Sequence, residues 1–557
     1  MPYSKYILKP GINREGTDYS NEGGWFDANL IRFRKGLPEK IGGWQKITSN
    51  YVLGIARALH GWVNLNTTKF LGIGTTWKYY VESGNVFNDI TPIRATTSAG
   101  DVTFAKVAND DATITVSDTA HGAVQNDFVT FSGAASLGGN IVANVLNQEY
   151  QIATIVNDNS YTIEAKDTDG DTVLANSSDS GNGGSSTVGV YQINVGLDDY
   201  VPGSGWGASS WGSGGFGSTS ALSETNQLRL WSHDNFGEDL IINPRAGGVY
   251  YWDQSSGLST RAVALSSLSG ANLPPTKVLQ VLVSDIDRHV ICLGADPLND
   301  SGTARTGSID PMFICWSDQE NATQWEPTLS NTAGSFRLSA GSSIVGGLRA
   351  RQETLVWTDM SLYSMTFIGS PYVFSTNLVN EGVGLIGPKA SINAPNGVFW
   401  MDLKGFYFYN GSVSALPSSV HDYVFSDINL VQSYKVFGFL NKAFDEIGWF
   451  YCSGSSTEID RYVLYNYVEQ TWSIGQLARH SWLDEGVEDY PRATGTDTYN
   501  YLYKHETGND ADGSPMDNVY IESSSLDIQE GDYFTFVNRI IPDIRFTGTN
   551  SGAAMNI

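Results

Sequence analysis

The sequence predicts an all-β fold: a degenerate β-propeller with an inserted small β-barrel or β-sandwich domain and irregular platform regions. Composition is the first observation behind this prediction. The 557 residues include 60 glycines, 15 tryptophans, 28 tyrosines and 24 phenylalanines, and only 17% are charged, which favours strands and tight turns over helices. The second observation is a rhythm of short apolar runs separated by Asn, Gly and Ser, which returns in units of roughly 40–50 residues.

The first of these units reads as four strands rich in β-branched and aromatic side chains. Its runs are ARALHGWV, KFLGIGT, WKYYVES and NDITPI. The pattern returns after residue 220, beginning with QLRLWSH, DLIINPR, GVYYWDQS and TRAVALS. We therefore expect the following organisation: an N-terminal arm and platform region at 1–50, a first propeller segment at 51–94, the remaining blades at 188–480 and a C-terminal β region at 481–557.

Three segments depart from the strand rhythm. Residues 95–187 shift to Ala, Thr, Asn and Asp and contain no Trp. We predict an inserted β domain there, flanked by DITPIR and VYQINVG as strands of the host. Residues 203–217 form a Gly/Trp-rich loop within the blades. The run LPSSVHDYVFSDINLVQSYK at 416–435 is the best helix candidate, with Ser418 or Ser419 as its cap.

The charge balance restricts the class of partner. The net charge is −26, which argues against a surface that grips nucleic acid, because such binding needs clustered Lys and Arg. The charge is uneven: eight Lys and Arg against five acids in residues 1–50, and fourteen acids against two Lys in residues 101–200. A solvated surface or an assembly with a basic and an acidic end would account for this.

The remaining global signals concern cysteines, export and membranes. The three cysteines lie far apart in apolar runs, as expected of buried free thiols. The start MPYSKYILKPG does not resemble a signal peptide. Nowhere do 18 consecutive apolar residues occur, so we predict no membrane span.

The stretch ICWSDQENATQWEP at 314–327 comes close to the Asp-box that marks blade turns in sialidase-like enzymes. That motif is a turn device, in which polar side chains accept backbone N–H groups and the Trp packs between strands. We interpret Asp318 as a turn former and Trp316 and Trp325 as blade-packing residues. The stretch thus predicts a blade and carries no chemistry.

The sequence gives little support for a catalytic site or a metal site. A glycosidase needs two carboxylates at a fixed separation, and the densest acidic group follows Trp482, a residue type that often forms a sugar platform. We interpret this group as a solvated acidic loop. The segments DTDGD at 167–171 and NDADGSPMDN at 509–518 lack the distal Glu of a calcium loop. We predict no enzyme activity, no catalytic residues, no cofactor and no metal site. A propeller-type glycan-binding or depolymerase protein is the alternative.

Several segments, taken in order, resemble one protein family. They are PGINREGTDYSNEGGWFDANLIRFRKGLPEKIGGWQK, ICWSDQENATQWEP, AGSSIVGGLRARQETLVWTDMSLYSMTFIG, and DGSPMDNVYIESSSLDI followed by FVNRIIPDIRF. The chain is similar here to the tail nozzle, or packaged-DNA stabilisation, proteins of short-tailed bacteriophages. The resemblance covers the chain apart from the insert, which looks like small β modules found in phage tail proteins.

The resemblance implies a structural protein of the virion tail, assembled in the host cytoplasm. Members of this family form a homohexameric ring below the adaptor (head-to-tail connector) ring. The ring extends the DNA ejection channel, retains packaged DNA, and carries a tail fibre or tailspike and a needle or plug. Genomic DNA would pass through the lumen without specific binding.

Combined with the charge pattern, the resemblance yields two groups of candidate residues. The adaptor-contact candidates are Arg14, Arg32, Arg34 and Lys35. The channel-lining candidates are Asp484, Glu485, Glu488, Asp489, Asp510 and Asp512. The last residues, TGTNSGAAMNI, begin another strand, which predicts either pairing with the N-terminal region or a sequence that ends early.

Overall fold

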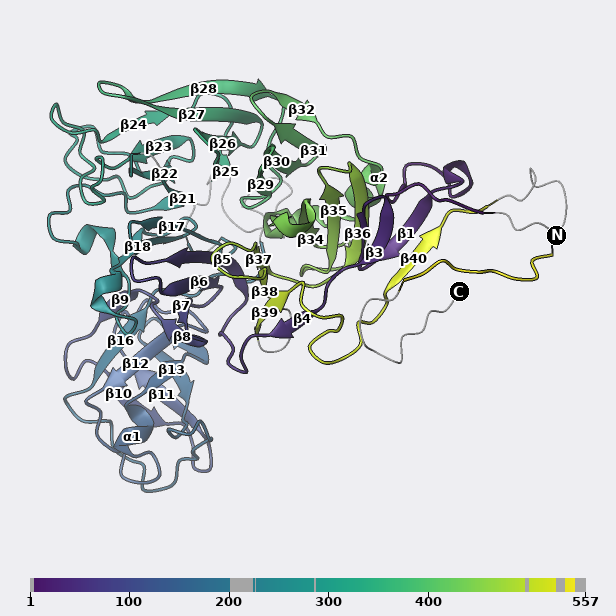
Figure 1. Cartoon of the computed structure of the whole chain (residues 1–557). Coiled ribbons are helices and arrows are strands. Elements are labelled where there is room, and N and C mark those ends of the chain that lie inside the picture. Colours follow the sequence, from purple (N-terminus) through teal and green to yellow (C-terminus); the bar gives the residue numbers. More distant parts are fainter. Residues whose placement is uncertain are drawn as a thin grey trace, which may run out of the picture. The chain divides into compact units, whose positions relative to one another are not determined.

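The computed structural model describes residues 5–200, 224–225, 227–284, 287–495, 500–526 and 536–545. It confirms an all-β, propeller-like fold made of small antiparallel sheets (Figure 1). The chain divides into two compact units: residues 1–49, 389–495 and 501–557 form unit 1, and residues 50–388 and 496–500 form unit 2. The Gly/Trp-rich loop at 203–217 and the last residues, 546–557, lie outside the described residues.

Unit 2 contains four sheets of the propeller type, each made of four strands that follow one another in sequence. They are β5 (Ala56–Val63), β6 (Lys69–Thr75), β7 (Tyr79–Ser83), β8 (Val86–Asp89); β17 (Trp231–Phe236), β18 (Asp239–Pro244), β19 (Tyr250–Trp252), β20 (Val263–Ala264); β21 (Val278–Val283), β22 (Val290–Ala295), β23 (Phe313–Trp316), β24 (Gly334–Arg337); and β25 (Ile344–Arg349), β26 (Thr354–Thr358), β27 (Ser361–Gly369), β28 (Val373–Glu381). The first strands of successive sheets contact one another: β17 contacts β5 and β21, and β21 contacts β25.

The apolar core of unit 2 lies between neighbouring sheets. Trp62 and Phe70 of the first sheet meet Trp252 of the next at ring-centroid distances of 6.3 and 6.2 Å. These side chains alternate with residues on the opposite face, as the two-residue period of a strand requires. Strands β5 and β6 coincide with the predicted runs ARALHGWV and KFLGIGT. Strand β7 begins two residues inside the run WKYYVES, and β8 overlaps the run NDITPI only at its first two residues.

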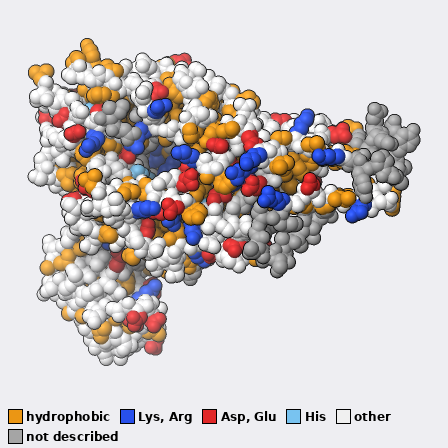
Figure 2. All heavy atoms as spheres, in the orientation of Figure 1, with side chains coloured by type: hydrophobic (Ala, Val, Ile, Leu, Met, Phe, Trp, Pro, Cys, Tyr) orange, Lys and Arg blue, Asp and Glu red, His pale blue; other side chains and the backbone are white. Residues whose placement is uncertain are grey.

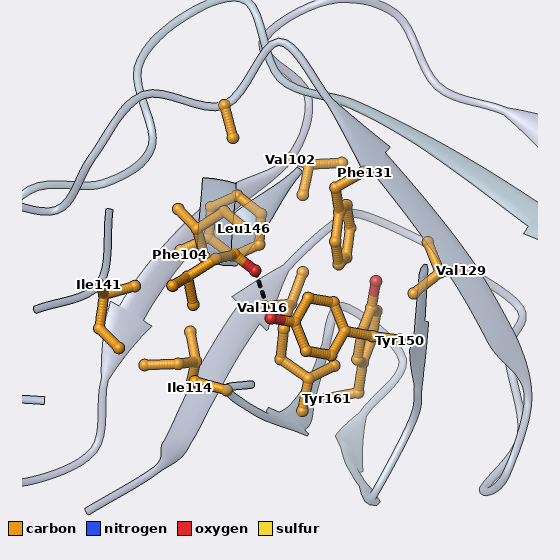
Figure 3. Packing of buried hydrophobic residues seen from close by; sticks show 14 of the residues in the cluster. Val102, Phe104, Ile114, Val116, Val129, Phe131, Ile141, Leu146, Tyr150 and Tyr161 are labelled. Atoms are coloured by element: carbon orange, nitrogen blue, oxygen red, sulfur yellow. Dashed lines mark hydrogen bonds between the residues drawn. The ribbon is translucent and has the colours of Figure 1, made fainter. Parts of the chain in front are cut away.

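The insert forms two further four-stranded sheets around its own core (Figure 3). One sheet has the order β10-β11-β15-β14 and the other β13-β12-β16-β9. Their bounds are β9 (Ile93–Thr96), β10 (Thr103–Lys106), β11 (Thr113–Ser117), β12 (Phe128–Ser132), β13 (Glu149–Gln151), β14 (Thr154–Asn157), β15 (Ser160–Glu164) and β16 (Val188–Gln192), with the short helix α1 (Ala143–Leu146) between β12 and β13.

The prediction for the flanks of the insert is wrong. The runs DITPIR and VYQINVG were expected to be host strands, but their strands β9 and β16 pair with each other and complete the second sheet of the insert. The physical reason lies in Tyr191 of β16, which is buried in the core of the insert beside Phe131 and Tyr161. The domain therefore includes its flanking strands.

Unit 1 contains three more four-stranded sheets. Two are β29 (Ser391–Ala394), β30 (Gly397–Asp402), β31 (Gly405–Tyr409), β32 (Val413–Ala415), and β33 (Phe437–Asn441), β34 (Glu446–Tyr451), β35 (Arg461–Asn466), β36 (Thr471–Gln476). The third joins β37 (Ser481–Leu483), β38 (Arg492–Thr494) and β39 (Leu502–His505) to β4 (Trp44–Lys46) from the N-terminal region. A strand from the start of the chain thus supplies the fourth strand of the last sheet.

Two small sheets complete unit 1. Strand β1 (Trp25–Asn29) pairs with β40 (Tyr520–Ser523), and β2 (Ile31–Arg34) pairs with β3 (Leu37–Lys40) in a tight hairpin. The β1–β40 pair again joins residues about 500 positions apart. The N-terminal arm and the C-terminal β region are therefore one folded body.

Helix is scarce, as predicted, but its limits differ from the expected 416–435. The α-helix α2 covers His421–Asp427, and a 3₁₀ turn follows at Leu430–Lys435. Neither predicted serine caps it, because the Ser418 hydroxyl accepts from the Val420 N–H and the Ser419 hydroxyl donates to the Ile12 carbonyl. Other 3₁₀ turns lie at Tyr19–Asn21, Gln254–Ser256, Leu265–Ser267 and Lys442–Phe444. Over the described ranges, no helix reaches the length and apolarity of a membrane span.

Candidate functional site

Arg32, predicted to contact the adaptor, is instead buried at the centre of an ion-pair network in unit 1. It is 3% exposed, and its guanidinium makes two hydrogen bonds to the Glu506 carboxylate, one of them 3.1 Å long. Its Nε lies 3.3 Å from the Glu446 Oε1, and the group stacks over the Phe444 ring at 3.7 Å. A buried arginine cannot meet another protein's surface, so the structure assigns Arg32 to internal pairing.

Burial also decides the ionisation of this network. Removal from water works against the charge of Arg32, but the two carboxylates outweigh it and raise the Arg32 pKa. Burial raises the pKa of Glu446 to about 8, although Arg32 acts in the opposite direction. Glu506 pairs with Arg32 through both of its oxygens, while Glu446 holds a proton more strongly than a solvent-exposed glutamate does.

We expect the stability of unit 1 to fall as pH rises from about 4.5 to about 8. The ordinary pKa of a glutamate is 4.5 and burial raises that of Glu446 to about 8, so the folded state holds a proton that the unfolded chain releases. The stabilisation is complete below pH 4.5 and is lost as pH passes the folded pKa. At about 1.4 kcal/mol per pKa unit, the loss amounts to a few kcal/mol. Urea unfolding at pH 5 and pH 8.5 measures it; parallel loss in wild type and Glu446→Gln would contradict this assignment.

Arg34 and Lys35, two other adaptor-contact candidates, are exposed at the tip of the β2–β3 hairpin. The turn has positive φ angles at Lys35 (53°) and Gly36 (73°), as a two-residue turn between twisted strands requires. The Glu469 carboxylate accepts the N–H groups of both residues, that of Gly36 at 2.9 Å. The turn is held through its backbone, and both basic side chains are exposed. The Arg34 guanidinium also lies over the Phe444 ring at 5.2 Å.

Arg14, the fourth candidate, is partly engaged within unit 1. Its Nη2 lies 3.2 Å from the Asp27 Oδ2, and its guanidinium lies over the Phe26 and Tyr423 rings at 4.3 and 4.8 Å. These contacts attach the N-terminal arm to β1 and α2. The hairpin tip is thus the stronger candidate for an external contact.

The acidic group at 484–489 lies in the connection between β37 and β38. Asp484 accepts the Lys442 N–H at 3.3 Å, and burial, followed by the neighbouring Glu485, raises its pKa to about 6. Glu488 pairs with Arg492 at 2.8 Å, while Asp489 is exposed. The connection therefore carries less free negative charge than its sequence indicates.

Asp510 and Asp512 attach the N-terminal strand β4 to the C-terminal region. The Asp512 carboxylate accepts the Lys46 N–H at 3.0 Å and lies 3.5 Å from the Lys46 Nζ. The Asp510 carbonyl accepts the Trp44 N–H at 3.0 Å. The Asp512 carboxylate therefore has a structural role in unit 1, whereas Asp510 contributes its backbone here.

Trp482, a residue type that often forms a sugar platform, is half-buried against the core of unit 1. Its ring lies 5.2 Å from that of Phe439 and 4.7 Å from that of His505. Its Nε1 donates to the Leu440 carbonyl at 3.0 Å. These contacts use the indole for packing within unit 1 and leave it half-buried.

The Asp-box-like stretch forms a turn and a packed corner of unit 2. The Asp318 carboxylate accepts the Thr332 N–H at 2.8 Å and its hydroxyl at 2.7 Å. Burial acts to raise the Asp318 pKa, but these hydrogen bonds have the larger effect and lower it. Trp316 donates to the Thr332 carbonyl, and Trp325, 1% exposed, donates to the Ala322 carbonyl. Each polar group is used locally in folding.

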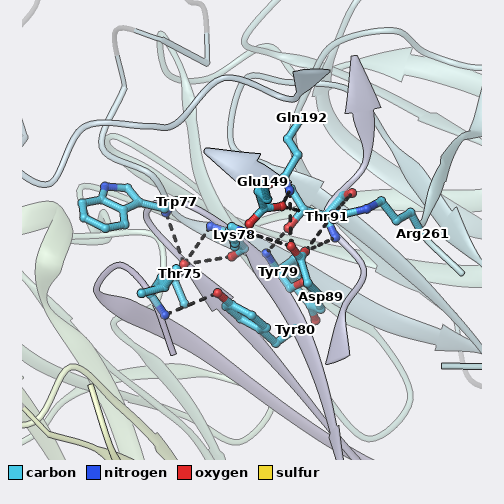
Figure 4. A network of polar contacts seen from close by, with 11 residues as sticks. Thr75, Trp77, Lys78, Tyr79, Tyr80, Asp89, Thr91, Glu149, Gln192 and Arg261 are labelled. Atoms are coloured by element: carbon cyan, nitrogen blue, oxygen red, sulfur yellow. Dashed lines mark hydrogen bonds and ion pairs between the residues drawn. The ribbon is translucent and has the colours of Figure 1, made fainter. Parts of the chain in front are cut away.

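A charged network that sequence reasoning missed fixes the insert to its host sheet (Figure 4). Lys78, 3% exposed, lies 2.9 Å from the Asp89 carboxylate of the host and also pairs with Glu149 of the insert. Arg261 pairs with Asp89 at 3.0 Å, and Gln192 donates to Glu149 at 2.7 Å. Burial opposes the charge on Asp89, but the two cations outweigh it and lower its pKa. The one sequence signal was a lysine inside the apolar run WKYYVES.

The two Asp-rich segments form turns. Asp167 accepts the N–H groups of Asp169 and Asp171 at 3.0 and 2.9 Å, and Asp510 accepts that of Gly513 at 3.3 Å. In the part of the chain that the structure describes, no three His, Cys, Asp or Glu side chains gather as metal ligands would. Acidic and basic side chains are interspersed on the face shown in Figure 2.

Comparison with known proteins gives no family. No protein-family model matches the chain, and no curated protein sequence matches it. Among solved structures, the computationally designed Ika8 protein is similar at a TM-score of 0.34 and 8% identity, over 83% of this chain and 99% of that one. Hsv2 of Kluyvelomyces marxianus gives 0.29 and 6%, over 54% and 78%, and the AfRom2 CNH domain gives 0.27 and 8%, over 50% and 94%.

Proposed function

We propose that this chain is a structural tail nozzle (hub) protein of a short-tailed bacteriophage. In this role it forms a ring below the adaptor, extends the DNA ejection channel, retains the packaged DNA and anchors fibres or spikes. The resemblance of the ordered segments supports the proposal. The protein would act through its surfaces and its assembly and would carry out no reaction.

The observation that carries the proposal is the folding together of the resembling segments. Segments at 10–46 and 512–546 lie at opposite ends of the chain, yet β1 pairs with β40, and the Asp512 carboxylate accepts the Lys46 N–H at 3.0 Å. The segments at 314–327 and 340–369 form parts of two successive sheets of unit 2. The segments resemble one family in the same order, and they also fold against one another. This combination supports a relationship over the whole chain, because single motifs could be similar by chance.

The hairpin tip supplies the expected contact with the adaptor. We expect Arg34→Glu/Lys35→Glu to weaken co-sedimentation of the protein with purified portal–adaptor complexes by roughly ten-fold or more, because reversing two rim charges opposes an acidic face. The matched control is Arg351→Glu/Lys404→Glu, which reverses one Arg and one Lys at other exposed positions. Equal binding by both double variants would place the docking face elsewhere.

The acidic loop at 484–489 supplies the expected repulsion of DNA. Within a Debye length of about 8 Å, acids on the channel wall keep the duplex from adhering as it leaves. We expect Glu485→Gln/Asp489→Asn to slow DNA release from assembled particles by roughly two- to ten-fold while assembly stays intact. Release is followed by dye fluorescence after receptor triggering. Asp300→Asn/Glu320→Gln removes the same charge from exposed positions of unit 2, and equal rates for both would contradict the channel-lining role.

A further inference from the structure

The hairpin of β27 and β28 carries an uncharged, apolar tip. Both strands have nine residues, and their tip extends past β26, whose pairing with β27 ends at Met365. Residues 366–380 contain no Lys, Arg, Asp or Glu. The exposed fractions of Phe367, Ile368 and Tyr372 are 36%, 55% and 77%. Exposed apolar side chains grouped in this way mark a contact surface.

A pocket of about 170 Å³ lies elsewhere in unit 2, in the sheet of β21–β24 and its loops. Its walls are almost equally polar and apolar. They comprise Pro297, Leu298, Phe313, Trp325 and Pro327, with Arg305, Cys315 and Ser335 as polar members. A cavity of about 150 Å³ with apolar walls is large enough for a benzene ring. The pocket is therefore of the size that one aromatic side chain fills.

Arg305 is held in place at this pocket. Its Nε donates to the Leu273 carbonyl at 2.8 Å and its Nη1 to the Asp296 carbonyl at 3.0 Å. A guanidinium fixed in this way offers its face to an aromatic ring and its remaining N–H groups to a phenol oxygen. The chemistry of the pocket thus suits a tyrosine.

The hairpin packs against one face of the β21–β24 sheet, and the pocket lies on the other face. Trp316 points toward the hairpin, where its ring lies 5.1 Å from that of Phe374. Its neighbour Cys315 lines the pocket, and neighbouring residues of a strand point to opposite faces. Tyr372 is 77% exposed, so within one copy the hairpin tip is not inserted in the pocket.

We propose that Tyr372 at the hairpin tip of one copy inserts into the Arg305 pocket of a second copy of this chain. Tyr372 and the pocket belong to different surfaces of one protein, so the contact is head-to-tail. A pair of copies keeps one unused Tyr372 and one unused pocket. Such contacts close into rings or extend as filaments, according to the rotation between copies. The inference deepens the ring of the proposed function by naming one contact between its subunits.

The first test uses two complementary variants in sedimentation velocity. Tyr372→Ala removes the inserting side chain, and Ser335→Phe fills the pocket from an exposed position of β24. We expect each variant to associate about 30-fold more weakly than wild type, the loss typical of a hot-spot aromatic. A 1:1 mixture retains one good interface and should give dimers but no larger species. The control Tyr490→Ala, which removes another exposed tyrosine, should behave as wild type.

A cross-linking experiment covers the case of weak association. In a Cys315→Ala background, equal amounts of Tyr372→Cys and Ser335→Cys proteins are mixed with oxidised glutathione, which accepts the two electrons and two protons of disulfide formation. A covalent heterodimer in excess of either homodimer is expected. Absence of this heterodimer at high protein concentration would overturn the contact. A ring seen in particles with Tyr372 outside any pocket would overturn the contact alone and leave the proposed function standing.

Discussion

Arg32→Ala is expected to lower the free energy of unfolding by about 3–5 kcal/mol, the usual cost of removing one partner from a buried ion pair. The substitution leaves the Glu506 carboxylate without the guanidinium that binds both its oxygens. It also removes the cation that opposes the raised pKa of Glu446. Denaturant unfolding followed by tryptophan fluorescence measures the change.

The matched control for this variant is Arg34→Ala, two residues along the same strand. Arg34 is exposed at the hairpin tip, so its removal should change stability by no more than about 0.5 kcal/mol. Similar losses for the two alanine variants would mean that Arg32 is not the internal partner that its contacts indicate. An adaptor-binding defect in a stably folded Arg32→Ala protein would return Arg32 to the docking candidates.

Trp325→Ala is expected to cost about 3–5 kcal/mol, as truncation of a buried tryptophan usually does. The side chain is 1% exposed, belongs to the core between the β17–β20 and β21–β24 sheets, and donates its indole N–H to Ala322. Its removal leaves a cavity and an unpaired carbonyl. Thermal unfolding and the near-ultraviolet circular dichroism signal measure the loss.

Leu329→Ala serves as the comparison for Trp325→Ala. Leu329 lies four residues further on and is fully exposed, so truncation removes no buried contact and stability should be nearly unchanged. If Trp325→Ala were as mild as this control, Trp325 would be a surface residue of the turn and the packing role assigned to the Asp-box-like stretch would fail.

Much of the fold could be predicted because its strands are short, aromatic and bounded by turn residues. Strands β5 and β6 match the expected runs for this reason. The flanks of the insert were misassigned because the sequences of β9 and β16 suit a strand of the host and a strand of the insert equally well. The burial of Tyr191 in the core of the insert shows that they belong to the insert. The predicted helix at 416–435 was too long, because local sequence periodicity carries no information on distant contacts. One of these is the hydrogen bond that Ser419 donates to the Ile12 carbonyl.

The candidate site was less predictable, because charge counts carry no information on pairing. Arg32 and Glu506 are 474 residues apart, and nothing local marks Arg32 as buried while Arg34 is exposed. Likewise, Lys78 and Glu149 meet only because the insert returns beside its host sheet. Trp482 stands before four acids in the sequence, yet its ring faces Phe439 and His505. Long-range contacts of this kind follow from topology and cannot be inferred from composition.

Electron microscopy of the assembled tail particle tests the central claim most directly. Rotational classes computed about the tail axis should show a six-fold ring of this protein below the adaptor, with a channel wide enough for duplex DNA and the hairpin tip of β2–β3 at the adaptor face. Separate peripheral lobes that do not surround the axis would contradict the nozzle function.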